Sequence, residues 1–251
     1  MKRKVNISLA LILALPFTLL AQDYKLTKST GRLELMLGRV SVEGTSGNEI
    51  TFSSSDRERK QDERAKGLKE INSLGLDDNT GLGINVEDKG GVVTVRQLKK
   101  MNSPEIKILV PKGVTISYSF DSQYGGLVSF KNVQSEIEVS ANYNSVELTN
   151  VTGPLTVKSI YGHVEAIFDQ TVKGPISIVS VYGFADVTLP ASTKANLKLS
   201  TSHGEILIAP EFKIETDRAD DSGDRLTGKI NGGGTSIAVT CNYGKVYLRT
   251  K

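Results

Sequence analysis

The sequence predicts an all-β protein, a single-stranded β-solenoid with about 20 residues per coil. Two observations carry this prediction: a short tyrosine-containing signature recurs at nearly constant spacing, and apolar residues keep a fixed register to it. The composition agrees with it, because 24 glycines and no tryptophan suit short strands joined by many turns.

The first 21 residues have the layout of a secretory signal peptide. Basic residues at 2–4 precede an apolar run, Ile7–Leu20, and Ala21 stands before the expected cleavage point. No cysteine follows the run, so we expect no bacterial lipid anchor. No later apolar stretch approaches membrane-spanning length, so we expect no integral membrane segment in the mature chain. The predicted location is the periplasm or the outer cell surface.

Removal of the signal peptide changes the charge balance. The whole chain has 31 Lys and Arg against 28 Asp and Glu, and three of the basic residues lie in the signal, which leaves 28 of each sign. A mature chain of zero net charge is not expected to bind nucleic acid. The single cysteine, Cys241, has no partner for an internal disulfide and is expected to fill a small core position.

The signature divides the mature chain into an N-terminal capping region, 22–112, and solenoid repeats, 113–251. Its central residues define a repeat-marker column. They are Tyr124, Tyr143, Tyr161, Tyr182, His203 and Tyr243, with spacings of 19, 18, 21, 21 and 40, the last being about two periods.

Apolar residues occur six and four positions before each marker and three and five positions after it. Of these 24 positions only Ser129 is not apolar. Alternation by two on each side of the marker is strand periodicity, and the parity changes at the marker, so the chain bends there. Residues two before the marker are small and form a polar column near the corner. Stacked coils satisfy this pattern, and an antiparallel hairpin-repeat sheet is the alternative.

The remaining segments are less regular. Strands are expected within 32–52 and at Val92–Val95 and Ile106–Val110, and residues 56–75 predict a short helix that covers the open end of the solenoid. Residues 209–236 form an excursion between the fifth and sixth repeats, expected to be a protruding hairpin or loop.

These segments resemble a known family. The stretches VTGPLTVKSIYGHVEA, KGPISIVSVYGFADVTLP and LTGKINGGGTSIAVTCNYGKVYLR are similar to the putative-adhesin family of exported bacterial proteins, domain of unknown function 4097. The resemblance covers nearly all of the mature chain. It implies a β-solenoid-like fold and a place in the envelope of a bacterium of the Bacteroidetes type. It implies no catalytic residues.

Three outward-facing acids are the main candidate ligand-contact residues. Glu147, Glu165 and Asp186 each lie four positions after a marker, so stacking places them in one column about 5 Å apart. Such a column is typical of a solvated face, and it is also compatible with a cation, a sugar contact or a pair of glycosidase acids. No Arg or Lys is obviously placed beside it.

The histidines and the tyrosines offer further candidates. His163 belongs to the possible ligand-contact face, and it lies two coils from His203, too far for one metal ion. The tyrosine column is expected to pack into the corner, with a sugar-stacking platform as the alternative. Asp217, Asp220, Asp221 and Asp224 do not have the spacing of an EF-hand loop.

The sequence therefore predicts a non-enzymatic cell-envelope protein, an adhesin or structural interaction protein. Its partner is an envelope protein, a glycan or a second copy. No cofactor is expected, with Ca²⁺ as the alternative. The rival hypothesis is a polysaccharide-acting or carbohydrate-binding β-helix protein that uses Glu147, Glu165 and Asp186.

Overall fold

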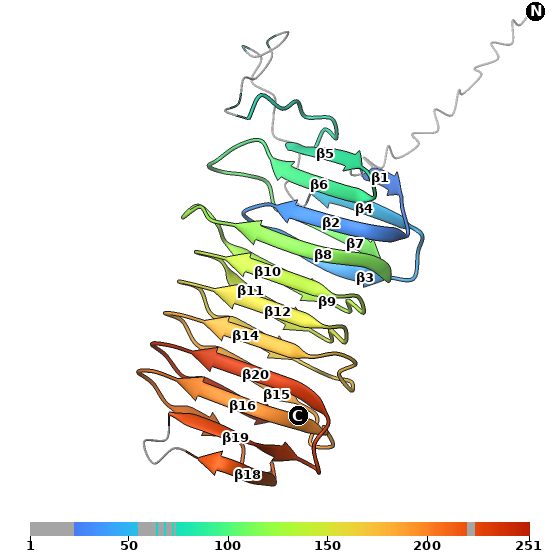
Figure 1. Ribbon diagram of the computed structural model, residues 1–251. Helices are drawn as coiled ribbons and strands as arrows, with labels where there is room; N and C mark the ends of the chain where they lie inside the picture. Colours follow the sequence, from blue (N-terminus) through green and yellow to red (C-terminus); the bar gives the residue numbers. More distant parts are fainter. Residues whose placement is uncertain (1–22, 55–63, 65–67, 69–71, 73, 220–223) are drawn as a thin grey trace, which may run out of the picture.

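The computed structural model describes residues 23–54, 64, 68, 72, 74–219 and 224–251, and these residues form two β-sheets that lie face to face (Figure 1). Most strands run across a long stack, so that each layer of the stack has one strand in each sheet.

The first sheet, sheet A, has ten strands. Their spatial order is β1 (Tyr24–Thr27), β4 (Glu49–Ser54), β7 (Ile106–Pro111), β3 (Val40–Thr45), β9 (Leu127–Lys131), β11 (Ser145–Thr149), β13 (Val164–Ile167), β15 (Ala185–Leu189), β21 (Val246–Thr250) and β17 (Ile206–Ile208).

The second sheet, sheet B, has eleven strands. Their spatial order is β18 (Ile214–Ala219), β19 (Arg225–Ile230), β16 (Ala195–Thr201), β20 (Thr235–Cys241), β14 (Ile176–Ser180), β12 (Leu155–Ser159), β10 (Ile137–Ala141), β8 (Gly113–Phe120), β2 (Thr30–Met36), β6 (Val92–Gln97) and β5 (Ile84–Lys89).

Like residues lie above like in successive coils, as the repeat predicts. Val146 pairs with Val164, Val164 with Ala185, and Ala185 with Val246, all between parallel strands. The two strands that flank each tyrosine belong to different sheets, because β10 lies in sheet B and β11 in sheet A. The antiparallel hairpin-repeat alternative is therefore wrong for these repeats. Antiparallel pairing among the described strands is confined to the two ends of the stack.

The coils do not follow one another in sequence order. The last coil, β20–β21, lies between the β14–β15 coil and the β16–β17 coil (Figure 1). A similar arrangement occurs near the N-terminus, where β2 lies between β8 and β6, and β3 lies between β9 and β7. The spacing of 40 between the fifth and sixth repeats therefore does not reflect a missing coil. The excursion reverses the order of these two coils in space.

The first repeat has a different register from the one that the sequence predicts. Val128, and not Leu127, pairs with Val146, and Ile116, and not Tyr118, pairs with Ile137. Its corner, between Phe120 and Leu127, is longer than the corners of the later repeats. The extra length explains why Ser129 appeared on the inward side: it points outward, and its neighbours Val128 and Phe130 are buried.

The polar column near the corner has a defined role. Four of its six members donate a side-chain hydrogen bond to a backbone carbonyl oxygen in the adjacent coil. The pairs are Ser159 to Asn144 at 3.0 Å, Ser180 to Gly162 at 3.3 Å, Cys241 to Gly183 at 3.2 Å and Thr201 to Gly244 at 3.2 Å. These bonds give a donor to carbonyl groups at the bend.

The glycines that follow Tyr161, Tyr182 and Tyr243 are required by the close approach of neighbouring coils. A Cβ atom at Gly183 would lie 2.3 Å from the carbonyl oxygen of Gly162, and one at Gly244 would lie 1.9 Å from that of Gly183. Both distances are far inside van der Waals contact, so only glycine lets successive corners stack at strand spacing.

The predicted helix over 56–75 is not supported. Most of this segment lies outside the described residues, and those that are described include Leu68, Asn72 and Leu74, which are in no α-helix. Leu68 and Leu74, which a helix covering the end of the solenoid would bury, are exposed. The described strands at this end of the stack finish instead in the antiparallel strands β1 and β5.

The excursion at 209–236 contains the hairpin β18–β19, which continues sheet B beyond β16 and does not protrude from it. Phe212, in the connection before β18, is buried in the hydrophobic core. The hairpin therefore covers the last layer of the stack on one side, while sheet A ends at the three-residue strand β17.

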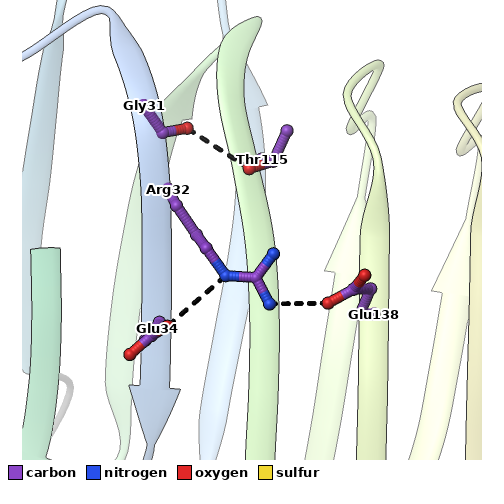
Figure 2. Close-up of polar contacts among 5 residues, drawn as sticks. All are labelled: Gly31, Arg32, Glu34, Thr115 and Glu138. Carbon is purple, nitrogen blue, oxygen red and sulfur yellow. Dashed lines mark hydrogen bonds and ion pairs between the residues drawn. The ribbon is translucent and has the colours of Figure 1, made fainter. Parts of the chain in front are cut away.

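The outer face of sheet B is polar. Arg32 on β2 reaches across β8 to Glu138 on β10, with Nη2 and Oε2 2.6 Å apart, and its Nε lies 3.4 Å from Glu34 (Figure 2). The hydrogen bond that Arg32 donates to Glu138 raises the pKa of Arg32. Thr115 donates to the carbonyl oxygen of Gly31 in the same region.

Candidate binding site on the aromatic corner

A ladder of stacked rings runs along the corner where sheet B turns into sheet A. We call it the tyrosine ladder; its members, in spatial order, are Tyr143, Tyr161, Tyr182, Tyr243 and His203. Successive ring centroids are 5.0, 5.2, 5.0 and 5.1 Å apart, and the planes of successive rings differ by 8–20°.

Backbone hydrogen bonds between coils set this spacing. The N–H group of Tyr161 donates to the carbonyl oxygen of Asn142, that of Tyr182 to Ile160, and that of Tyr243 to Val181, at 2.8–2.9 Å. The N–H group of His203 donates to Asn242 at 2.8 Å. The corner thus continues the strand ladder, and identical residues on it must stack at about 5 Å.

The tyrosine ladder is exposed, and this corrects the expectation that the tyrosines pack into the corner. Tyr143 is 45% exposed, and Tyr161, Tyr182 and Tyr243 are 54–56% exposed. Parallel rings in contact with centroids about 5 Å apart are offset, so each covers only part of its neighbour's face. Each step of the ladder therefore presents a ring edge, part of a ring face and a hydroxyl group.

Tyr124 is not a member of the ladder. Its N–H group contacts Ser122 Oγ at 3.4 Å and Gly125 donates to the Ser122 carbonyl oxygen, so the long first corner closes on itself. Asn144, which replaces the usual glycine, is buried and donates from Nδ2 to the carbonyl oxygens of Gly38 and Gly126 at 2.7 and 2.8 Å.

A second group of rings lies beside the ladder on sheet A. The His163 and Phe184 rings stack with centroids 4.6 Å apart, and Phe184 meets Tyr247 edge to face at 6.1 Å. His163 Nδ1 is 3.0 Å from Ser145 Oγ, and the Arg249 guanidinium lies 5.1 Å from the centre of the Tyr247 ring. His163 and His203 are three coils apart along the stack and not two, because the β20–β21 coil lies between them.

The three acids form the predicted column, and it has basic neighbours that the sequence did not reveal. Glu147 pairs with Glu165, and Glu165 with Asp186, on adjacent parallel strands. Arg249 Nε donates to both carboxylate oxygens of Asp186 at 2.8 and 2.9 Å, and His163 Nε2 lies 3.7 Å from Glu165. Tyr247, and not Leu207, follows Asp186 in the column.

The described residues do not form a metal site or a reactive cysteine site. Among them no three His, Cys, Asp or Glu side chains form a group able to hold a metal ion. Asp220 and Asp221 lie outside the described residues, and the backbone places Asp217 on β18. Cys241 is buried, and burial raises the pKa of its thiol, which disfavours the reactive thiolate.

Sequence reasoning missed Phe184, Tyr247 and Arg249. The first two carry a readable signal, because Phe184 occupies the position of His163 and Tyr247 that of Asp186 relative to their markers. Arg249 carries no such signal, because its contact with Asp186 depends on the pairing of β21 with β15.

The fold and this corner define a class: an all-β stack of parallel coils with a row of exposed aromatic side chains along one corner. The Toastrack DUF4097 family model matches residues 119–249, more than half of the chain, and the chain belongs to this family. None of the curated proteins matches the sequence. Where the structure is described, no helix has the length and apolar character of a membrane span.

Two solved structures are similar to this chain. One is a "putative cell adhesion protein" from Clostridium sporogenes, with a TM-score of 0.48 and 14% identity over 92% of this chain and 100% of that one. The other is a "putative adhesin" from Bacteroides fragilis, with a TM-score of 0.45 and 14% identity over 92% of this chain and 96% of that one. The family assignment rests on the family model.

Proposed function

We propose that this protein is a non-enzymatic component of the bacterial cell envelope that binds its partner through the tyrosine ladder. The observation that carries the proposal is the exposure of five stacked rings along one corner, four of them tyrosines that are 45–56% exposed. Tyrosine is enriched at binding surfaces because it offers an apolar ring and a polar hydroxyl together.

The distribution of aromatic residues supports the choice of this corner. Both histidines, five of the eight tyrosines and Phe184 lie in the ladder or in the adjoining group on sheet A. The outer face of sheet B carries polar side chains such as Thr156, Lys158 and Ser177 at the corresponding strands. A rigid platform of parallel strands also limits the entropy lost when a partner binds.

Export is the second part of the proposal, and it rests on the segment before Gln22, which lies outside the described residues. Expression of the full chain in a bacterium, followed by mass spectrometry of the N-terminus, tests it. A mature protein that begins at Gln22 in the periplasm or envelope fraction is the expected result. A chain that keeps Met1 in the cytoplasm contradicts export.

Retention on isolated cell envelopes tests the binding surface. The double variant Tyr161→Ala/Tyr182→Ala should lose most of the retention, whereas Tyr124→Ala, an exposed tyrosine on the same edge but outside the ladder, should keep it. Equal retention of the double variant and the wild type would place the binding surface elsewhere.

The rival is an enzyme that cleaves polysaccharides with the acid column, favoured by the in-register placement of Glu147, Glu165 and Asp186. The contact of Arg249 Nε with both carboxylate oxygens argues for a structural role of Asp186. Alanine at all three acids separates the hypotheses, because loss of a glycan-cleaving activity would refute the non-enzymatic proposal. A role for Ca²⁺ is tested by thermal unfolding with and without EDTA, where we expect no change.

A further inference from the structure

We infer that the ligand of the tyrosine ladder is a neutral, linear polysaccharide with equatorial 1,4-linkages, which lies along the ladder with one sugar ring per coil. This inference rests on the proposed function, because it names the chemical class of the partner for the same surface.

The spacing of the ladder is the first argument. Its rings repeat every 5.0–5.2 Å over four steps, in one continuous series set by the strand ladder. An equatorially 1,4-linked pyranose chain is an extended ribbon that advances by about the length of one sugar ring per residue, which is close to this spacing. A ligand with the period of the protein makes the same contact at every coil, so its affinity grows with its length until the ladder ends.

The chemistry of each step is the second argument. The offset between neighbouring rings leaves part of each tyrosine face uncovered, against which the C–H groups of a sugar pack. The tyrosine hydroxyls, and the His203 ring at one end, supply hydrogen-bonding groups for sugar hydroxyls. Because the corner backbone is held by bonds between coils, the spacing of these residues is set before the ligand binds.

Charge is the third argument, and it selects a neutral ligand. Glu147, Glu165 and Asp186 form a column on the sheet A face next to the ladder, with Glu165 45% exposed as a side chain. Arg249 offsets the charge of Asp186, but an anionic polymer along the ladder would run beside Glu147 and Glu165 and be repelled. A second copy of the chain packed ladder to ladder would also bring two such columns near each other, which disfavours self-association through this corner.

Defined oligosaccharides test the inference most sharply. Calorimetric titration of the mature chain with cello-oligosaccharides and chito-oligosaccharides of increasing length should give affinity that rises with each added sugar and levels off at about five. Polyglucuronate made by oxidation of cellulose, an acidic polymer with the same equatorial 1,4-linkages, should bind more weakly than either neutral series at equal sugar concentration, and Glu147→Gln/Glu165→Gln should reduce that difference.

Variants place the ligand on the ladder. Tyr182→Ala, in the middle of the ladder, should lower affinity for the longest oligosaccharide about tenfold, the value of one lost aromatic contact. Tyr182→Phe keeps the ring and should lose less affinity than Tyr182→Ala. It serves as a second variant in case Tyr182→Ala fails to fold. Tyr124→Ala should bind like the wild type.

The possible failures are distinguishable. If neither neutral series binds while envelope retention still depends on Tyr161 and Tyr182, the ligand is of another class and the inference is wrong, although the proposed function stands. If sedimentation shows a dimer that Tyr182→Ala dissociates, the ladder is a self-association surface and the inference is also wrong. If retention does not depend on the ladder, the proposed function itself fails.

Discussion

The ring of Tyr182 lies on that of Tyr243, with 5.0 Å between centroids and 11° between planes, although the whole β16–β17 coil and its hairpin separate the two in sequence. This contact exists because β20–β21 inserts between two earlier coils. It makes the tyrosine ladder continuous and leaves His203, the one member that is not tyrosine, at its end.

Removal of a central ring tests whether the stack stabilises the fold. Tyr182→Ala should lower the free energy of unfolding by about 1 kcal/mol, and a double-mutant cycle with Tyr161→Ala should give a coupling of about 0.5–1 kcal/mol. Urea denaturation measures both. Tyr124→Ala is the matched control. A coupling of zero between Tyr161 and Tyr182 would show that the contact between the two rings does not stabilise the fold.

Gly183, which follows Tyr182, gives a steric prediction. Gly183→Ala places Cβ 2.3 Å from the Gly162 carbonyl oxygen, so we expect a loss of about 3 kcal/mol or more, or a failure to fold. Gly47→Ala is the control, since its Cβ would meet Thr45 at an ordinary 3.6 Å. Chemical denaturation measures the stability of both variants. Equal stability of Gly183→Ala and Gly47→Ala would mean that the corners are not in close contact.

Tyr118 predicts a specific dependence of stability on alkaline pH. It is buried, its hydroxyl donates to the Leu37 carbonyl oxygen at 2.8 Å, and burial raises its pKa above the ordinary 10.0. The unfolded chain loses the Tyr118 proton at lower pH than the folded chain. The contribution of Tyr118 to the free energy of unfolding is therefore complete below pH 10 and falls above it, by up to about 1.4 kcal/mol per pH unit.

Tyr118→Phe isolates this effect from other alkaline titrations. The variant should be less stable at neutral pH by about 1 kcal/mol, because the Leu37 carbonyl loses its donor. Its stability should then fall less steeply than that of the wild type between pH 10 and 11.5. Parallel slopes for the two proteins, measured by urea unfolding, would contradict a buried neutral tyrosine.

The repeat and its inward rows were predictable from sequence because they rest on alternation, which each strand carries locally. The rows at Val146, Val164 and Ala185 show this, and so does the small polar column at Ser159 and Ser180. The order of the coils was not predictable in this way. His203 and Tyr243 sit in repeats with the same pattern, so the aliphatic rows are equally well formed in either order.

Two further features depended on contacts that a single repeat does not encode. The register predicted for the first repeat is wrong because its corner is longer than the others. Positions counted from Tyr124 therefore placed Leu127 and Ser129 on the inward side. The exposure of the ladder was missed because parity along a strand does not continue through a bend. The rings of Tyr161 and Tyr182 are exposed at the corner and stack on each other.

Crosslinking tests the spatial order of the coils most directly. In Tyr182→Cys/Tyr243→Cys the two residues are neighbours in the stack, and in Tyr182→Cys/His203→Cys they are two coils apart, about 10 Å, beyond the reach of a disulfide. Oxidation followed by mass spectrometry and thiol counting should show a bridge in the first variant and two free introduced thiols in the second. A bridge between positions 182 and 203, with none between 182 and 243, would mean that the coils follow the sequence and that the ladder described above does not exist.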